Sequence, residues 1–142
     1  MLSPSDNISH LSERSYGFLF DTSIFNIETA DAIAIEARYR LSAYCPSLFA
    51  RLGVARPESL NQTVTKRQAE FLAGRLLARV ALELLGQPVS TIEIGRHRSP
   101  IWPSGLAGSI SHSGDRCISV LVLDENTRVG IDTEKIVNGE SL

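Results

Sequence analysis

The feature that most constrains the fold is a segment in the middle of the chain with strong helical periodicity, from about Thr65 to Leu85. Thr65 and Gln68 have the spacing of a capping box at its start, and Gly86 and Pro88 are stop signals at its end. The pattern predicts one long amphipathic helix that must bury one face against another layer. The apolar residues that recur at intervals of three and four are Phe71, Leu72, Leu76, Val80, Leu84 and Leu85.

The sequence after this helix changes to a β-type pattern. Thr91–Gly95 alternates apolar and polar residues, Cys117–Leu123 is strongly β-like, and Val129–Glu134 reads as a third short strand. Arg96–Gly108 is expected to be a loop, and Asp124–Arg128 a turn that makes a hairpin of the last two strands. One long helix against a small antiparallel sheet predicts an α+β fold.

The part before the helix is less regular. Met1–Arg14 is polar and is expected to be a flexible N-terminus, which leaves 15–142 as the folded domain. Tyr16–Phe20 is expected to be a strand, and Ala43–Asn61 short helical turns joined by loops. Glu28–Leu41 is expected to be a helix, because its apolar residues have helical spacing: Ile27, Ala30, Ile33, Ala34, Ala37 and Leu41.

Size and composition exclude several classes of protein. A chain of 142 residues with 43% hydrophobic and 21% charged residues has the composition of one globular domain. A net charge of −2 argues against a general nucleic-acid-binding coat. No stretch approaches the roughly 18 consecutive apolar residues of a membrane span, and the N-terminus lacks a signal-peptide pattern. Only Cys45 and Cys117 are present, which excludes a disulfide framework and favours a reducing cytoplasm.

Gly74 stands in the middle of the long helix, where glycine costs about 1 kcal/mol relative to alanine. Such a glycine indicates the close approach of another backbone or a ligand. Tight packing of the helix on a sheet explains it equally well.

Four polar segments could carry chemistry, and the first is the acidic pair Asp132 and Glu134. In a strand, residues i and i+2 point to the same face, so the two carboxylates project together. Mg²⁺ takes one or two carboxylates and fills its octahedron with water and phosphate oxygens. The pair therefore fits a magnesium site, although acidic residues at a solvated strand end would look the same.

The second segment is Gly108–Gly114, which is rich in serine and glycine and contains Ser111 and His112. Small residues allow a ligand to approach the backbone, and hydroxyl, amide and imidazole groups can bind phosphate oxygens. The alternative is a Ser/Gly turn whose histidine bonds backbone. A serine-hydrolase site is disfavoured, because the Gly-x-Ser-x-Gly pattern is missing.

The other two segments are basic. Arg67 and Arg75 on the long helix, near Lys66 and Arg79, are eight residues apart and lie on broadly the same side, where they could clamp a phosphorylated ligand. Solvated charges, or an ion pair of Arg67 with Glu70, are the alternative. A loop then presents Arg96, His97 and Arg98 before the rigid sequence Pro100-Ile101-Trp102-Pro103, which could also be a surface loop anchored by a buried tryptophan.

Together and in this order, the four segments resemble one family, the 4′-phosphopantetheinyl transferases, and most closely its enterobactin synthase component D-like branch. The resemblance covers roughly residues 18–136, as the N-terminal lobe of that fold. The matching motifs are Lys66-Arg67-x-x-Glu70-Phe71-Leu72-Ala73-Gly74-Arg75, Arg98-x-Pro100-x-Trp102-Pro103, Gly108-Ser109-Ile110-Ser111-His112-Ser113 and Val129-Gly130-Ile131-Asp132-x-Glu134.

The resemblance implies a pseudo-twofold pair of α/β lobes with the active site between them. It implies an Mg²⁺-dependent transfer of the phosphopantetheine arm of coenzyme A to a serine of an acyl or peptidyl carrier protein, in siderophore or other nonribosomal peptide synthesis. The implied metal ligands are Asp132 and Glu134, which with His112 form the implied catalytic set. The residues implied to bind coenzyme A are Arg67, Arg75, His97, Arg98, Ser111 and His112.

The sequence departs from the family pattern after Glu134. The second lobe of the family carries a Trp/Phe-Ser-x-Lys-Glu motif, whose glutamate supplies a metal ligand or the base, and nothing after Glu134 matches it. The chain is therefore expected to represent the first lobe only. Besides the transferase reaction, this leaves an inactive lobe that still binds coenzyme A or metal, or a remnant that dimerises.

Overall fold

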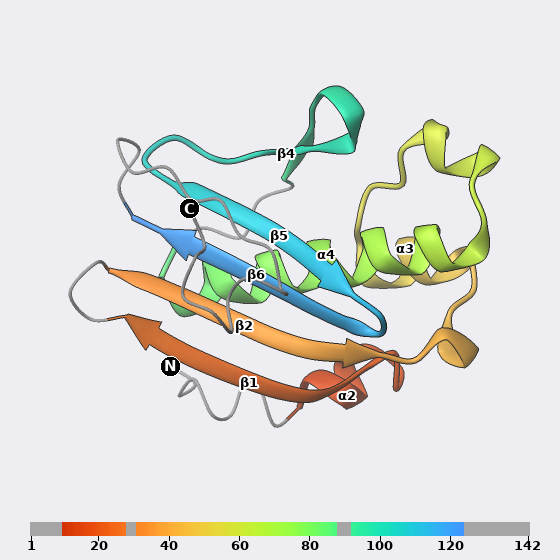
Figure 1. Ribbon diagram of the computed structural model, residues 1–142, viewed down its shortest axis with the longest axis horizontal. Helices are drawn as coiled ribbons and strands as arrows, with labels where there is room; N and C mark the ends of the chain where they lie inside the picture. Colours follow the sequence, from red (N-terminus) through yellow and green to blue (C-terminus); the bar gives the residue numbers. More distant parts are fainter. Residues whose placement is uncertain (1–9, 28–30, 88–91, 124–142) are drawn as a thin grey trace.

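The computed structural model describes residues 10–27, 31–87 and 92–123. The main sheet has four strands. Figure 1 shows that this sheet is twisted and that one long helix lies across a single face of it. The elements in chain order are α2 (Leu11–Arg14), β1 (Leu19–Ile27), β2 (Ala32–Tyr39), η2 (Leu41–Ala43), α3 (Ser47–Leu52), η3 (Glu58–Gln62), α4 (Thr65–Leu84), β3 (Glu93–Ile94), η4 (Arg96–Arg98), β4 (Pro100–Ile101), β5 (Ala107–Ser113) and β6 (Arg116–Val122).

The sheet has the strand order β1-β2-β6-β5, and every neighbouring pair is antiparallel. The long helix α4 packs mainly on the central strands β6 and β2 and also touches β5 (Figure 1). A separate pair of two-residue strands, β3 and β4, brackets the η4 turn. The structure confirms the expected α+β fold, a long helix packed on a small antiparallel sheet.

The long helix lies where its periodicity predicts, but the capping box is wrong. The helix begins at Thr65 after Val64, and no side chain caps its first turn. Gln68 turns away from the helix start, and its amide donates to the carbonyl oxygens of Leu60 at 3.2 Å and Thr63 at 3.1 Å. Gln68 is buried, and its hydrogen bonds connect the helix to the preceding η3 turn in place of a cap.

Two glycines of the helix have separate structural reasons. Gly86 adopts φ +73° just beyond the helix end, the left-handed conformation of a glycine stop. Gly74 faces the sheet, because a Cβ there would lie 2.5 Å from Cγ2 of Ile110 and 3.6 Å from Sγ of Cys117. Tight helix–sheet packing, and no ligand, accounts for the glycine in the middle of the helix.

The expected helix over 28–41 is wrong, because the described part of this segment contains strand β2. The α4-facing side chains are buried at every second position, namely Ile33, Ile35, Ala37 and Tyr39. Ala34 is buried on the opposite face with Ile118 and Val120. A strand that is buried on both faces loses strict alternation, so its apolar residues also fit intervals of three and four.

Other boundaries differ more modestly. β1 begins at Leu19, near the end of the strand expected over 16–20, because Tyr16 and Gly17 have positive φ and form a turn. The helical turns expected over 43–61 are present. The strand and turn expected over 124–134 lie outside the described residues. Among the described residues, β6 forms its hairpin with β5, and no helix is long and apolar enough to cross a membrane.

Candidate functional site

Three segments that are separated in sequence enclose one pocket of about 320 Å³. Helix α4 supplies one wall, strand β5 a second, and the loop around η4 a third. Five of the six residues that the sequence implicated in ligand binding line this space, and Ser111 is not among them. The lining residues, which define the anion pocket, are Arg67, Glu70, Phe71, Arg75, His97, Arg98, Ser99, Pro100, Ile110 and His112.

The alternation of side chains along strand β5 determines which of them reach the pocket. The alternative of a Ser/Gly turn over 108–114 is wrong, because Ala107–Ser113 pairs along its whole length with β6. Ile110 and His112 are two residues apart, share one face and both line the pocket. Ser111 lies between them in the strand, so its side chain leaves on the other face.

Gly108 is explained by a neighbouring side chain. A Cβ at this position would lie 2.6 Å from Cε2 of Trp102, and the indole Nε1 donates to the Gly108 carbonyl oxygen at 3.1 Å. Trp102 is half-buried against the core. The tryptophan therefore fixes the loop before β5 onto the strand, which confirms the alternative of an anchored loop without removing its basic residues from the pocket.

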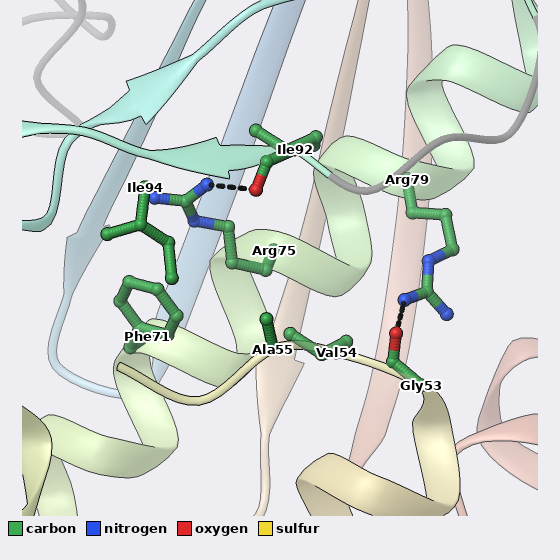
Figure 2. Close-up of a pocket in the computed structure, with 8 residues that line it drawn as sticks. All are labelled: Gly53, Val54, Ala55, Phe71, Arg75, Arg79, Ile92 and Ile94. Carbon is green, nitrogen blue, oxygen red and sulfur yellow. Dashed lines mark hydrogen bonds between the residues drawn. The ribbon is translucent and has the colours of Figure 1, made fainter. Parts of the chain in front are cut away.

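Arg75 is buried and holds the loop wall of the pocket. Its guanidinium donates to the carbonyl oxygens of Ile92 and Glu93 at 3.5 Å and of Arg98 at 3.0 Å. Figure 2 shows this side chain reaching from α4 to Ile92, and its Cζ lies 4.7 Å from the ring centre of Phe71. Burial lowers the pKa of Arg75 to about 10, so it stays charged at neutral pH.

The loop that Arg75 holds has an unusual backbone. His97 has φ 55° and Arg98 has φ 61°, the left-handed region that non-glycine residues seldom occupy. Gly95 donates its N–H to the Ser99 carbonyl at 2.7 Å, and the Ser99 hydroxyl donates to the Arg96 carbonyl at 2.7 Å. Strain of this kind persists where surrounding contacts fix it, and it gathers at ligand clamps.

His112 reaches the helix across the floor of the pocket. Its Nδ1 lies 3.5 Å from Oε2 of Glu70, and Nη1 of Arg67 lies 3.9 Å from the same oxygen. The hydroxyl of Tyr39 approaches Oε1 of Glu70 at 3.5 Å, and burial raises the Tyr39 pKa to about 12, so the phenol stays protonated. The sequence suggested a pair of Arg67 and Glu70, but it held no local signal for the contacts from β2 and β5.

Arg79 has a structural role. Its guanidinium donates to the carbonyl oxygens of Leu52 and Gly53 at the end of α3. The cavity between Arg79 and Arg75, drawn in Figure 2, has a volume of about 20 Å³. Since one water needs roughly 10–15 Å³, this space is too small for an organic ligand.

The donor set of the anion pocket suits a ligand that carries several negative charges. Arginine, histidine and one carboxylate supply the ionisable groups of its lining, and the cations outnumber Glu70. Planar guanidinium groups bind phosphate oxygens bidentately. Asp132 and Glu134 lie outside the described residues, and no group of three or more metal-binding side chains occurs within 10–27, 31–87 and 92–123. The magnesium site stays a prediction.

Comparison with known proteins gives the lineage. Residues 56–122 match the family model described as the 4′-phosphopantetheinyl transferase N-terminal domain. Enterobactin synthase component D of Salmonella typhimurium is 43% identical over 82 residues, which cover 57% of this chain and 33% of that protein. The 4′-phosphopantetheinyl transferase PptT of Mycobacterium tuberculosis is 42% identical over 74 residues, which cover 51% of this chain and 33% of that protein.

The matching segments cover about a third of the length of these curated relatives. The segment that matches the family model contains every residue that lines the anion pocket, from Arg67 to His112. The fold, the motifs and the comparisons thus agree on one lineage. Residues 56–122 are similar to the N-terminal domain of the 4′-phosphopantetheinyl transferase family.

Proposed function

We propose that this chain is the coenzyme A-binding part of a 4′-phosphopantetheinyl transferase. In the reaction, a serine hydroxyl of an acyl or peptidyl carrier protein attacks the β-phosphate of coenzyme A, and adenosine 3′,5′-bisphosphate leaves. One observation carries the proposal: α4, the η4 loop and β5 bring Arg67, His97, Arg98 and His112 around a single 320 Å³ pocket. These residues are far apart in the sequence, and the fold brings them to the same pocket.

The residues of the chain bind and orient the nucleotide in this proposal. Arg67 and Arg98 neutralise phosphate charge at the 3′-phosphoadenosine end, and His97 and His112 add donors. Arg75 shapes the pocket from behind through its bonds to the loop carbonyls. Fixed donors of this kind stabilise phosphoryl charge without reorganisation during the reaction. Mg²⁺, which we propose at Asp132 and Glu134, would neutralise the pyrophosphate of the bound substrate.

Binding without transfer is the second candidate function. One observation favours it: all the residues that line the anion pocket lie between Arg67 and His112. A siderophore pathway is supported by the similarity to enterobactin synthase component D. The carrier protein itself would be a peptidyl carrier in that case.

The experiment that tests the function has two arms. In the first, the protein is incubated with coenzyme A, Mg²⁺ and an apo carrier protein, and the carrier is weighed by mass spectrometry. A gain of one phosphopantetheine group supports transfer. In the second arm, calorimetry measures coenzyme A binding to the same protein. Binding without mass gain leaves the second candidate, and no binding in the second arm rejects both.

Arg67→Ala is expected to weaken coenzyme A binding by about tenfold, the loss of roughly one charge-assisted hydrogen bond. Dephospho-coenzyme A lacks the 3′-phosphate, so the variant and the wild type should bind it equally. Calorimetry with both ligands measures the difference. Arg116→Ala is the matched control, because Arg116 is an exposed arginine on β6 that pairs with Glu36 and does not line the pocket. Equal wild-type affinity for the two ligands would contradict the assignment of Arg67.

A further inference from the structure

Glu70 is an acidic residue in a pocket whose other ionisable lining residues are arginines and histidines. It is the one carboxylate among the lining residues, and its side chain is only 11% exposed. A negative charge in a poorly solvated wall repels a phosphorylated ligand, so its presence opposes binding unless it contributes something else. The contribution must come from the groups that the carboxylate contacts.

Those groups arrive from three different elements. Oε2 of Glu70 lies 3.5 Å from Nδ1 of His112 on β5 and 3.9 Å from Nη1 of Arg67, one turn earlier on α4. Oε1 lies 3.5 Å from the hydroxyl of Tyr39 on β2. That hydroxyl also lies 3.0 Å from the carbonyl oxygen of Gly114, so its single proton is shared between the two acceptors. One carboxylate thus joins the helix to two strands at the pocket.

The contact with His112 selects one of its two ring nitrogens. Nδ1 is the ring nitrogen that lies 3.5 Å from the carboxylate. A carboxylate at this distance favours a proton on Nδ1, which leaves Nε2 as the nitrogen available to a ligand. Without such a partner, neither the ring orientation nor the tautomer would be fixed. The same oxygen lies 3.9 Å from Nη1 of Arg67, so its charge favours positions of that 54% exposed side chain beside His112.

We infer that Glu70 is a positioning residue for anion binding, which fixes the tautomer and ring orientation of His112 and restrains Arg67 beside it. The inference rests on the proposed function for the identity of the anion, coenzyme A. Glu70 touches no ligand in this scheme. It offsets its own repulsion by ordering two donors before the ligand arrives, which reduces the entropy lost on binding.

A spectroscopic measurement tests the contact without any ligand. Two-bond ¹H–¹⁵N correlation spectra report which imidazole nitrogen carries the proton, at a pH where His112 is neutral. The wild type is expected to show the Nδ1–H tautomer. Glu70→Gln keeps a side-chain oxygen as acceptor and should retain it, whereas Glu70→Ala should revert to the Nε2–H tautomer that free histidine prefers. A loss of packing alone would not exchange the tautomer.

Coenzyme A titrations of the same proteins test the consequence. Glu70→Ala is expected to bind coenzyme A roughly tenfold more weakly, and Glu70→Gln within about threefold of the wild type. The matched control is Glu83→Gln, a glutamate on the same helix that pairs with Arg14 at 3.5 Å and does not line the pocket. It should leave both the tautomer and the affinity unchanged.

The outcomes separate this inference from the proposed function. An unchanged tautomer in Glu70→Ala overturns the positioning role, and so does tighter coenzyme A binding, which would show that Glu70 acts only as a repelling charge. A wild type that binds no coenzyme A overturns the proposed function. In that case the tautomer exchange still decides whether Glu70 positions His112.

Discussion

Replacing Arg75 with methionine is expected to lower the free energy of unfolding by about 2–3 kcal/mol, because the hydrogen bonds of a largely buried charged group to backbone carbonyls are lost. The same change is expected to weaken coenzyme A binding at least tenfold. Methionine fills much of the same apolar volume over Phe71, so the change removes donors more than packing. It leaves the carbonyls of Ile92, Glu93 and Arg98 without their partner.

The larger effect on binding follows from the backbone of the loop. His97 and Arg98 both have positive φ, and the Nη2 of Arg75 donates to the Arg98 carbonyl at 3.0 Å. Each such residue stores on the order of 1–3 kcal/mol of strain, which surrounding contacts must hold. Without Arg75 the loop can relax to negative φ and carry His97 and Arg98 out of the pocket.

Chemical denaturation measures the stability change, and calorimetry measures the binding change. Arg79→Met is the matched control, because Arg79 lies one turn further along α4 and also donates to backbone carbonyls, those of Leu52 and Gly53. It should lower stability while leaving coenzyme A affinity within about twofold. If Arg79→Met and Arg75→Met weakened binding equally, the loop would not depend specifically on Arg75.

Gly74→Leu is expected to lower the free energy of unfolding by about 3 kcal/mol, the upper range for overpacking a tight contact. The cause is the 2.5 Å approach of a Cβ at this position to Cγ2 of Ile110, a branched side chain on a paired strand. Relief would require α4 to move away from β5. Since Ile110 and His112 share one face of β5, the same movement would widen the anion pocket.

For the alanine variant, helix propensity and packing predict opposite changes in the free energy of unfolding. Helix propensity alone would make Gly74→Ala stabilising by about 1 kcal/mol, whereas the contact with Ile110 should make it destabilising. Chemical denaturation of Gly74→Ala, Ile110→Ala and the double variant measures their coupling. We expect the double variant to lose less free energy of unfolding than the sum of the losses in the two single variants. A stabilising Gly74→Ala would contradict close packing of the helix on the strand.

The elements whose apolar pattern has one dominant face could be predicted from sequence. Helix α4 buries one side on the sheet, so its spacing gave nearly the right boundaries. Strand β2 is central and has buried residues on both faces, so its spacing fitted a helix as well as a strand. Helix α4 starts at Thr65 as predicted, but the capping box does not form, because Gln68 bonds to the η3 turn, and a local capping pattern cannot show that.

The candidate site divides in the same way. Motif resemblance brought together Arg67, Arg75 and His112, which the structure places around one pocket. It did not show that Arg75 bonds to loop carbonyls. The position of a residue in a helix predicts which face its side chain is on, but not which segment packs against that face. The contacts of Glu70 with Tyr39 and His112 cross from the helix to two strands, so they become visible only in the folded chain.

A crystal structure of the protein grown with coenzyme A tests the central claim most directly, because it shows where the phosphates bind. The account predicts the nucleotide in the anion pocket, with phosphate oxygens within hydrogen-bond distance of Arg67 and of Nε2 of His112. Coenzyme A bound elsewhere on the chain, with the anion pocket empty, would contradict it.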